Sequence, residues 1–148
     1  MRPTPWLRAA SILTILHAIA HTIGGVFGST PPGPAETAVA SMKANTFLVM
    51  GLTRSFWMFY RGMGLCVTIF LTIEAVVFWL LGNAVRNSDA NLRPVLIAFL
   101  AGYLALAVDS FVYFFAPPVI VEILIAACLA MAIVAMKRPA RGLSEARP

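Results

Sequence analysis

"FWMFYRGMGLCVTIFLTIEAVVFWLL", residues 56–81, is an apolar stretch that contains only two charged side chains. A bilayer core requires about 20 such residues in one helix, whereas the strands of a membrane barrel would alternate apolar and polar residues. Three further stretches qualify as spans, at 7–27, 92–116 and 119–136. The sequence therefore predicts an all-α integral membrane protein, a four-helix bundle of antiparallel up-and-down topology that forms a single transmembrane domain over 1–148.

The composition agrees with this class. Of the 148 residues, 60% are hydrophobic and 11% are charged, whereas soluble domains contain about 45–50% apolar residues. No part of the chain outside the four stretches is long enough for a soluble domain. Cys66 and Cys128 lack metal-binding or redox spacing, so they are predicted to be free thiols.

The N-terminal stretch has a second interpretation. Arg2 and Arg8 precede an apolar run that reaches "AIA" at 18–20, a pattern also found before the cleavage site of a secretory signal peptide. Because the apolar run continues to Phe27, a retained span is favoured. Cleavage would leave three helices and would remove His17.

The net charge of +5 does not indicate a nucleic-acid partner, because the basic residues are distributed as in a membrane protein. In a four-span topology one side carries most of them, and cytoplasmic segments are enriched in Lys and Arg. Both ends, including a basic tail at 137–148, are therefore predicted to be cytoplasmic. The cytoplasmic set is Arg2, Arg8, Arg86, Arg93, Lys137, Arg138, Arg141 and Arg147, and the outer set is Lys43 and Arg54.

The outer loop at 28–55 is the only long predicted connection. It opens with the Pro/Gly cluster "STPPGPAET" at 29–37 and then has no strong helix breaker from Ala35 to Met50. Val39, Met42 and Val49 lie roughly on one helical face, which predicts a short amphipathic helix on the membrane surface. The other two connections are a basic turn that begins at Gly82 and the tight turn "APP" at 116–118.

Six ionisable side chains lie inside the predicted spans, where they are costly and normally face the bundle interior: His17, His21, Arg61, Glu74, Asp109 and Glu122. A rise of about 1.5 Å per residue places four of them in one layer, roughly 6–10 Å below the outer helix ends. These four are His21, Arg61, Asp109 and Glu122. His17 lies about a turn deeper, and Glu74 lies in the cytoplasmic half.

Helical periodicity predicts which faces point inward. The predicted inward stripes consist of small or polar residues, which allow close helix approach in lipid. They are Thr14, His17, His21, Gly24 and Gly28; Trp57, Arg61, Gly64 and Thr68; Ala98, Gly102, Ala105, Asp109 and Tyr113; and Glu122 with Ala126. Gly24 and Gly25 are predicted to form a close-packing surface for another helix.

The layer of His21, Arg61, Asp109 and Glu122 predicts a polar pocket that binds a hydrophobic small molecule, such as a lipid, a sterol-like compound or a quinone. The same groups could also convert this molecule by acid/base chemistry. The candidate catalytic groups are His21, Asp109 and Glu122. The candidate ligand-binding residues are His17, Arg61, Trp57 and Tyr113. The sequence implies no particular cofactor, and whether the protein is an enzyme is left open.

Three alternatives remain. In the first, the chain is a structural or accessory subunit, and Arg61 pairs with Asp109 or Glu122 only to order the helices. In the second, His17 and His21, spaced four apart on one helix face, bind a metal with a carboxylate. In the third, a dimeric proton-coupled carrier uses Glu74 and the outer cluster. The expected partners are the bilayer and the ligand, and homo-oligomerisation is open.

The stretches "RSFWMFYRGMG" at 54–64 and "HTIGG" at 21–25, with the four-helix layout, resemble small bacterial membrane proteins of DoxX-like architecture. A looser resemblance is to the EXPERA group of four-helix sterol isomerases and sterol-binding receptors. The first resemblance implies a multi-pass protein, and the second implies a hydrophobic cavity with buried carboxylates. Neither assigns a catalytic role to a residue of this chain.

Overall fold

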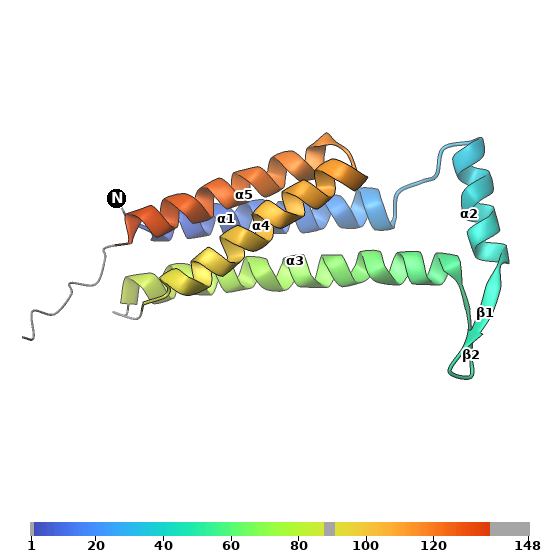
Figure 1. Ribbon diagram of the computed structural model, residues 1–148, viewed down its shortest axis with the longest axis horizontal. Helices are drawn as coiled ribbons and strands as arrows, with labels where there is room; N and C mark the ends of the chain where they lie inside the picture. Colours follow the sequence, from blue (N-terminus) through green and yellow to red (C-terminus); the bar gives the residue numbers. More distant parts are fainter. Residues whose placement is uncertain (1, 88–90, 137–148) are drawn as a thin grey trace, which may run out of the picture. The chain divides into compact units, whose positions relative to one another are not determined.

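The computed structural model describes residues 2–87 and 91–136, and most of them are helical (Figure 1). Helix α1 (Thr4–Ala20) continues into the π-helix η1 (His21–Val26), which is followed by α2 (Pro34–Ala44) and the strands β1 (Thr46–Val49) and β2 (Leu52–Ser55). The long helices α3 (Phe56–Asn87), α4 (Arg93–Tyr113) and α5 (Ala116–Ala135) follow. The chain divides into a middle unit, Thr14–Val76, and a terminal unit, the described residues of Met1–Leu13 and Val77–Pro148.

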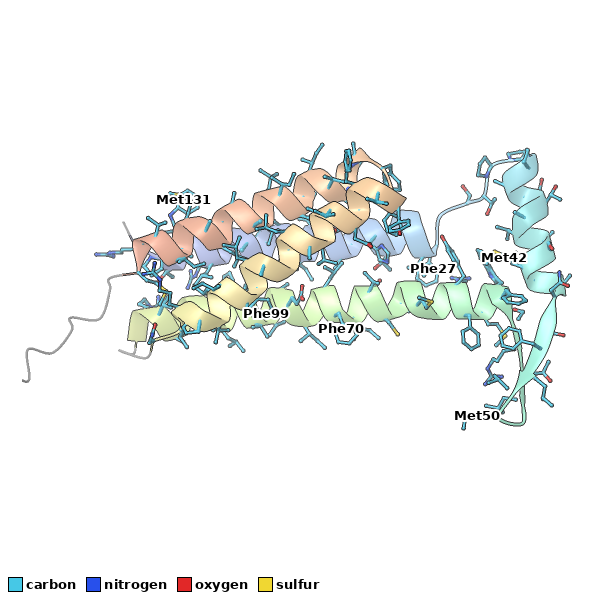
Figure 2. All side chains as sticks on the ribbon, in the orientation of Figure 1. Phe27, Met42, Met50, Phe70, Phe99 and Met131 are labelled. Atoms are coloured by element: carbon cyan, nitrogen blue, oxygen red, sulfur yellow. The ribbon has the colours of Figure 1, made fainter. Side chains whose placement is uncertain are left out.

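The described residues include four helical segments that are long and apolar enough to cross a bilayer: Thr4–Val26, Phe56–Arg86, Arg93–Tyr113 and Ala116–Ala135. The predicted all-α class and the four apolar helices are therefore confirmed. Large apolar side chains remain exposed along these helices, including Phe70 at 66%, Val108 at 65% and Val134 at 72% (Figure 2). Exposed apolar surface on this scale is typical of a protein covered by lipid or by another protein. The basic tail predicted at 137–148 lies outside the described residues.

Two helix boundaries differ from the prediction. Helix α3 starts at Phe56 as predicted, where Ser55 Oγ accepts a hydrogen bond from the Met58 N–H at 3.2 Å, but it extends past the predicted end at Leu81 into the expected turn, as far as Asn87. Helix α5 begins at Ala116, so the "APP" sequence is its first turn rather than a loop. Proline is favoured there because the first helical N–H groups have no intrahelical acceptor. The connection therefore consists of Phe114 and Phe115.

The outer loop contains the predicted helix, but that helix is shorter than expected. Helix α2 ends at Ala44, and the Asn45 side chain donates to the Ser41 carbonyl oxygen at 2.8 Å. The expectation of a helix up to Met50 is wrong, because residues 46–55 form a two-stranded antiparallel hairpin. Met50 and Gly51 join the strands with φ angles of +48° and +80°. Positive φ at both positions is the requirement of a type I′ hairpin turn.

The terminal unit has a core of large apolar side chains. Helices α4 and α5 pack along each other after their short connection (Figure 1). Phe78, in the part of α3 that belongs to the terminal unit, is fully buried, and its ring centroid lies 5.0 Å from that of Phe99 and 5.9 Å from that of Tyr103. The core cluster comprises Leu7, Ala10, Phe78, Leu96, Tyr103, Ile125, Ala126, Leu129, Ala132 and Ile133.

The two cysteines lie in different units. Cys66 belongs to the part of α3 in the middle unit, and Cys128 lies on α5 in the terminal unit. Both are free, as the sequence predicts.

Candidate functional site

The stretch "HTIGGV", residues 21–26, is wound as a π-helix and does not continue the α-helical pattern of α1. In a π-helix an N–H bonds the carbonyl five residues earlier, and here the Phe27 N–H donates to the Thr22 carbonyl at 3.0 Å. Gly24 and Gly25 weaken the α-helical preference of this segment. The backbone at Gly28 approaches the Gly24 carbonyl oxygen so closely that any Cβ at Gly28 would collide with it. Face assignments that assume an α-helix therefore fail after Ala20.

His21 connects this π-helix to α3. Its Nε2 lies 3.0 Å from the Gly64 carbonyl oxygen. Because a carbonyl oxygen only accepts, His21 carries its hydrogen on Nε2 and donates it. His21 and Val26, five residues apart, would be about 140° apart around an α-helix. The π-helical winding instead brings both of them to Gly64.

Gly64 is the glycine that permits this contact. A Cβ on Gly64 would lie 3.0 Å from Val26 Cγ2 and 3.9 Å from His21 Nε2, so any larger residue would displace its neighbours. The prediction that Gly24 and Gly25 form a close-packing surface for another helix is wrong, since a Cβ at Gly24 would meet nothing within 4 Å and a Cβ at Gly25 would meet only the His21 ring of the same π-helix. Within the π-helix it is therefore Val26, rather than Gly24, that lies against Gly64.

Threonine hydroxyls extend the contact between η1 and α3. The Thr22 and Thr68 Oγ1 atoms lie 2.9 Å apart, and Thr22 Oγ1 also donates to the Ala18 carbonyl at 2.6 Å. Thr68 Oγ1 in turn donates to the Gly64 carbonyl oxygen at 3.3 Å, so either threonine can be the donor between the two hydroxyls. One turn further along α3, Thr72 Oγ1 donates to the Thr68 carbonyl at 2.8 Å. Of the predicted stripe on α3, Gly64 and Thr68 are thus confirmed to face the first helix.

An open groove with a cavity volume of about 210 Å³ adjoins these hydroxyls. It is lined by Ile15, Ala18, Ile19, Thr22, Ile23, Thr68 and Thr72. Mostly apolar walls with a few polar groups are typical of small-molecule sites, although sites for drug-sized ligands measure about 300–1,000 Å³. The volume of this open groove lies below that range. Its lining includes neither predicted histidine and no carboxylate.

Cations and aromatic rings gather where α3 begins. The Arg61 guanidinium lies 4.6 Å from the Phe27 ring centroid and 6.0 Å from that of Trp57. Lys43 Nζ lies 5.3 Å from the same Trp57 ring, which stacks on Tyr60 with a centroid separation of 5.4 Å. Trp57 and Tyr60 match the aromatic residues expected at a membrane interface. Pairing of Arg61 with a carboxylate of the terminal unit stays a prediction.

The buried carboxyl group of Glu122 lies in the terminal unit. Its side chain is 4% exposed, and Oε1 accepts a hydrogen bond from Ser110 Oγ at 2.9 Å. Within the described residues, the buried Oε2 has no hydrogen-bond partner. The inward facing of Glu122 and Ala126 is therefore confirmed, and a hydroxyl–carboxyl hydrogen bond adds to the apolar packing of α4 against α5.

The predicted inward face of α4 is wrong. Its five residues, Ala98, Gly102, Ala105, Asp109 and Tyr113, are all exposed. The buried residues of α4 are Leu96, Tyr103, Ala107 and Ser110. Helix α4 carries apolar side chains on all of its faces, so the positions of its small residues do not identify the face that packs against the core. The core instead takes up the bulky Leu96 and Tyr103. The predicted catalytic role of Asp109 and the ligand-binding role of Tyr113 stay predictions.

The two histidines offer little to a metal ion. His17 is half-buried and its Nδ1 has no hydrogen-bond partner among the described residues, whereas His21 Nε2 bonds to Gly64. In residues 2–87 and 91–136, no group of three or more His, Cys, Asp or Glu side chains is arranged to hold a metal. Zinc sites use three or four protein ligands. The metal alternative therefore gains no support from this arrangement.

Sequence reasoning missed Thr22, Thr72 and Ser110. The spacing of Thr68 and Thr72, four apart on α3, places both on one face and was an available signal. Thr22 reaches Thr68 from η1, and the "GG" of 24–25 was the only local sign of irregular winding. Ser110 had no comparable signal, because its role depends on how α4 and α5 pack.

The chain matches no protein-family model, no curated protein and no solved structure. The observations define a largely helical chain with four candidate membrane spans, a π-helix held against α3, and an apolar groove beside two hydrogen-bonded threonines.

Proposed function

We propose that this chain is a multi-pass protein of a bacterial inner membrane, with both ends cytoplasmic and its four long helices running up and down. The exposed apolar side chains of these helices support insertion into a bilayer. The asymmetry of the basic residues supports the orientation, since Arg86 and Arg93 flank the second connection while Lys43 and Arg54 lie in the first. DoxX-like membership is part of the same proposal.

Within the membrane, its function is to bind a hydrophobic small molecule in the groove between the first helix and α3. The single observation that carries this proposal is the groove itself, with four aliphatic residues and three threonines in its lining. A lipid-like chain would contact Ile15, Ile19 and Ile23. A polar end group of the ligand would hydrogen-bond to free lone pairs of Thr22 and Thr68, because each hydroxyl oxygen accepts through two lone pairs.

The proposal is limited to binding, and His21 has a positioning role in it. No lining residue of the groove is titratable, so the groove contains no group for acid/base conversion. His21 holds η1 against α3 through Gly64, and this contact fixes Thr22 beside Thr68. Hydrophobic ligands of small cross-section, such as an acyl or isoprenoid chain, suit the volume of about 210 Å³ better than a sterol.

A structural or accessory subunit is the second candidate. The His21–Gly64 and Ser110–Glu122 contacts support it, because each one links two helices without requiring a ligand. Hydrogen bonds between membrane helices are worth only about 0.6 kcal/mol on average. If the chain is such a subunit, bulk lipid fills the groove, and the groove does not select one lipid over another.

Ligand retention after purification distinguishes the two candidates. The full chain is purified in detergent, extracted with solvent and analysed by mass spectrometry, beside Thr72→Phe, which fills the groove. The control is Val76→Phe, because Val76 is 55% exposed on the next turn of α3 and does not line the groove. We expect a defined hydrophobic molecule with the wild type and the control, and a loss of most of it with Thr72→Phe. Equal lipid profiles in all three samples would support the subunit candidate.

A further inference from the structure

The tip of the β1–β2 hairpin exposes a set of large apolar side chains. Leu48 is 74% exposed, Met50 97%, Leu52 54% and Val49 37%. Figure 2 shows Met50 at the end of the hairpin, beyond the rest of the strands. Val49 pairs with Leu52, while Leu48 lies on the opposite face of the two-stranded sheet, so both faces of the tip are apolar. A tip surrounded by water would normally be polar.

The turn chemistry also favours a polar residue at this point. Met50 has a φ of +48°, in the left-handed region that glycine, asparagine and aspartate adopt most readily. A type I′ turn is usually built from Asn-Gly, and here Met replaces the Asn before Gly51. The sequence thus places a strained, fully exposed apolar residue where a polar one would stabilise the fold. This choice is explained if the methionine side chain itself makes a contact outside the chain.

The base of the hairpin connects the tip to a candidate membrane interface. Phe47 of β1 packs on the start of α3, with ring centroid distances of 5.0 Å to Phe56 and 5.3 Å to Phe59. Strand β2 runs directly into α3, whose first turns carry interfacial aromatic residues. Lys43 precedes the hairpin and Arg54 lies on β2, and Glu36 is the single acidic residue in the whole loop. Basic residues beside exposed apolar ones match an anionic lipid surface.

We propose that the hairpin tip, defined as Leu48, Val49, Met50 and Leu52, inserts into the boundary between lipid headgroups and acyl chains. Lys43 and Arg54 then contact anionic headgroups, and the tip fixes the depth of the α3 entrance. Insertion to about 5–10 Å is the usual depth of interfacial apolar groups. The inference requires the chain to be embedded in a bilayer, as proposed above, but it does not depend on the groove.

Site-specific fluorescence tests this inference on the full chain. In a background of Cys66→Ala and Cys128→Ala, an environment-sensitive fluorophore is attached at Met50→Cys, at Leu48→Cys as a second tip position, or at Glu36→Cys as the control outside the tip. Each protein is reconstituted into phosphatidylcholine vesicles with or without phosphatidylglycerol. Quenching is measured with doxyl-labelled lipid and with aqueous iodide, and vesicle flotation on the same samples reports membrane incorporation.

We expect both tip labels to be quenched several-fold more by doxyl lipid than the Glu36 label and to be protected from iodide, with stronger lipid quenching when phosphatidylglycerol is present. Efficient iodide quenching of the tip would overturn the inference, because the tip would then lie in water. Protection from both quenchers would also overturn it, since a protein surface, such as a second copy, would then cover the tip. Failure to float would contradict membrane insertion itself, whereas the groove is tested separately by ligand retention.

Discussion

In the terminal unit the helices meet through large apolar side chains, whereas in the middle unit they meet through glycine, threonine and imidazole. Phe78, Leu96 and Tyr103 are at most 1% exposed and fill the core of the terminal unit. The middle unit instead packs Gly64 against Val26 and links Thr22 to Thr68. Interdigitated large side chains leave few voids, while contacts of small residues leave the groove. The terminal unit is therefore the more tightly packed of the two, and the groove to which we assign the proposed binding lies in the middle unit.

The largest expected effect tests the apolar core. Phe78→Ala should lower the free energy of unfolding by about 3–5 kcal/mol, because it removes a fully buried ring. Phe70→Ala on the same helix is the matched control, since Phe70 is 66% exposed, and it should change stability far less. Both variants are compared by denaturant-induced unfolding in detergent micelles. Equal losses of unfolding free energy in the two variants would contradict the view that a packed apolar core stabilises the terminal unit.

The second effect tests the glycine contact of the middle unit. Gly64→Val should destabilise the protein by about 1–3 kcal/mol, the usual cost of inserting atoms into a packed contact, because a side chain there would strike Val26. Gly62→Val is the matched control, since a Cβ at Gly62 meets nothing within 4 Å. Thermal unfolding of the purified variants measures the difference. If Gly62→Val were the more harmful change, the description of the η1–α3 contact would be incorrect.

The smallest effect tests the polar contact of the terminal unit. Ser110→Ala should cost about 0.6–1.7 kcal/mol, the range from the average to the maximum measured for hydrogen bonds between membrane helices. Asp109→Asn, at the neighbouring exposed position, is the control and should leave stability unchanged within about 0.5 kcal/mol. Glu122→Gln should be milder than Ser110→Ala, because its side-chain oxygen can still accept from Ser110. A greater loss for Asp109→Asn would indicate that Asp109 faces a partner.

The sequence predicted the long helices well and their faces only in part. Four apolar stretches identify spans because membrane thickness sets their length. On α3, Gly64 and Thr68 contrast with apolar neighbours, so the inward side was predicted correctly. On α4 the apolar residues leave no such contrast, and the predicted face was wrong. The sequence did not predict the β1–β2 hairpin, because Met50 replaces the polar residue that usually precedes a turn glycine.

The candidate site depended on features that no residue pattern reports. Periodicity correctly directed attention to His21, but the π-helix changes the register after Ala20 and replaces Gly24 with Val26 at the contact. Depth matching predicted one layer of His21, Arg61, Asp109 and Glu122, and that layer stays a prediction. In the middle unit, the groups that His21 and Thr22 contact are backbone carbonyls and a threonine hydroxyl, which hydropathy patterns scarcely distinguish from their apolar neighbours.

Photolabelling with a diazirine-bearing fatty acid tests the central claim, that residues 14–76 contain the binding groove, most directly. The account predicts that cross-links concentrate on peptides containing Ile19, Ile23 and Thr72, that excess unlabelled fatty acid prevents them, and that Thr72→Phe abolishes them while Val76→Phe does not. Labelling that is equally strong at exposed α4 residues such as Val108, and that is not reduced by competitor, would contradict the account.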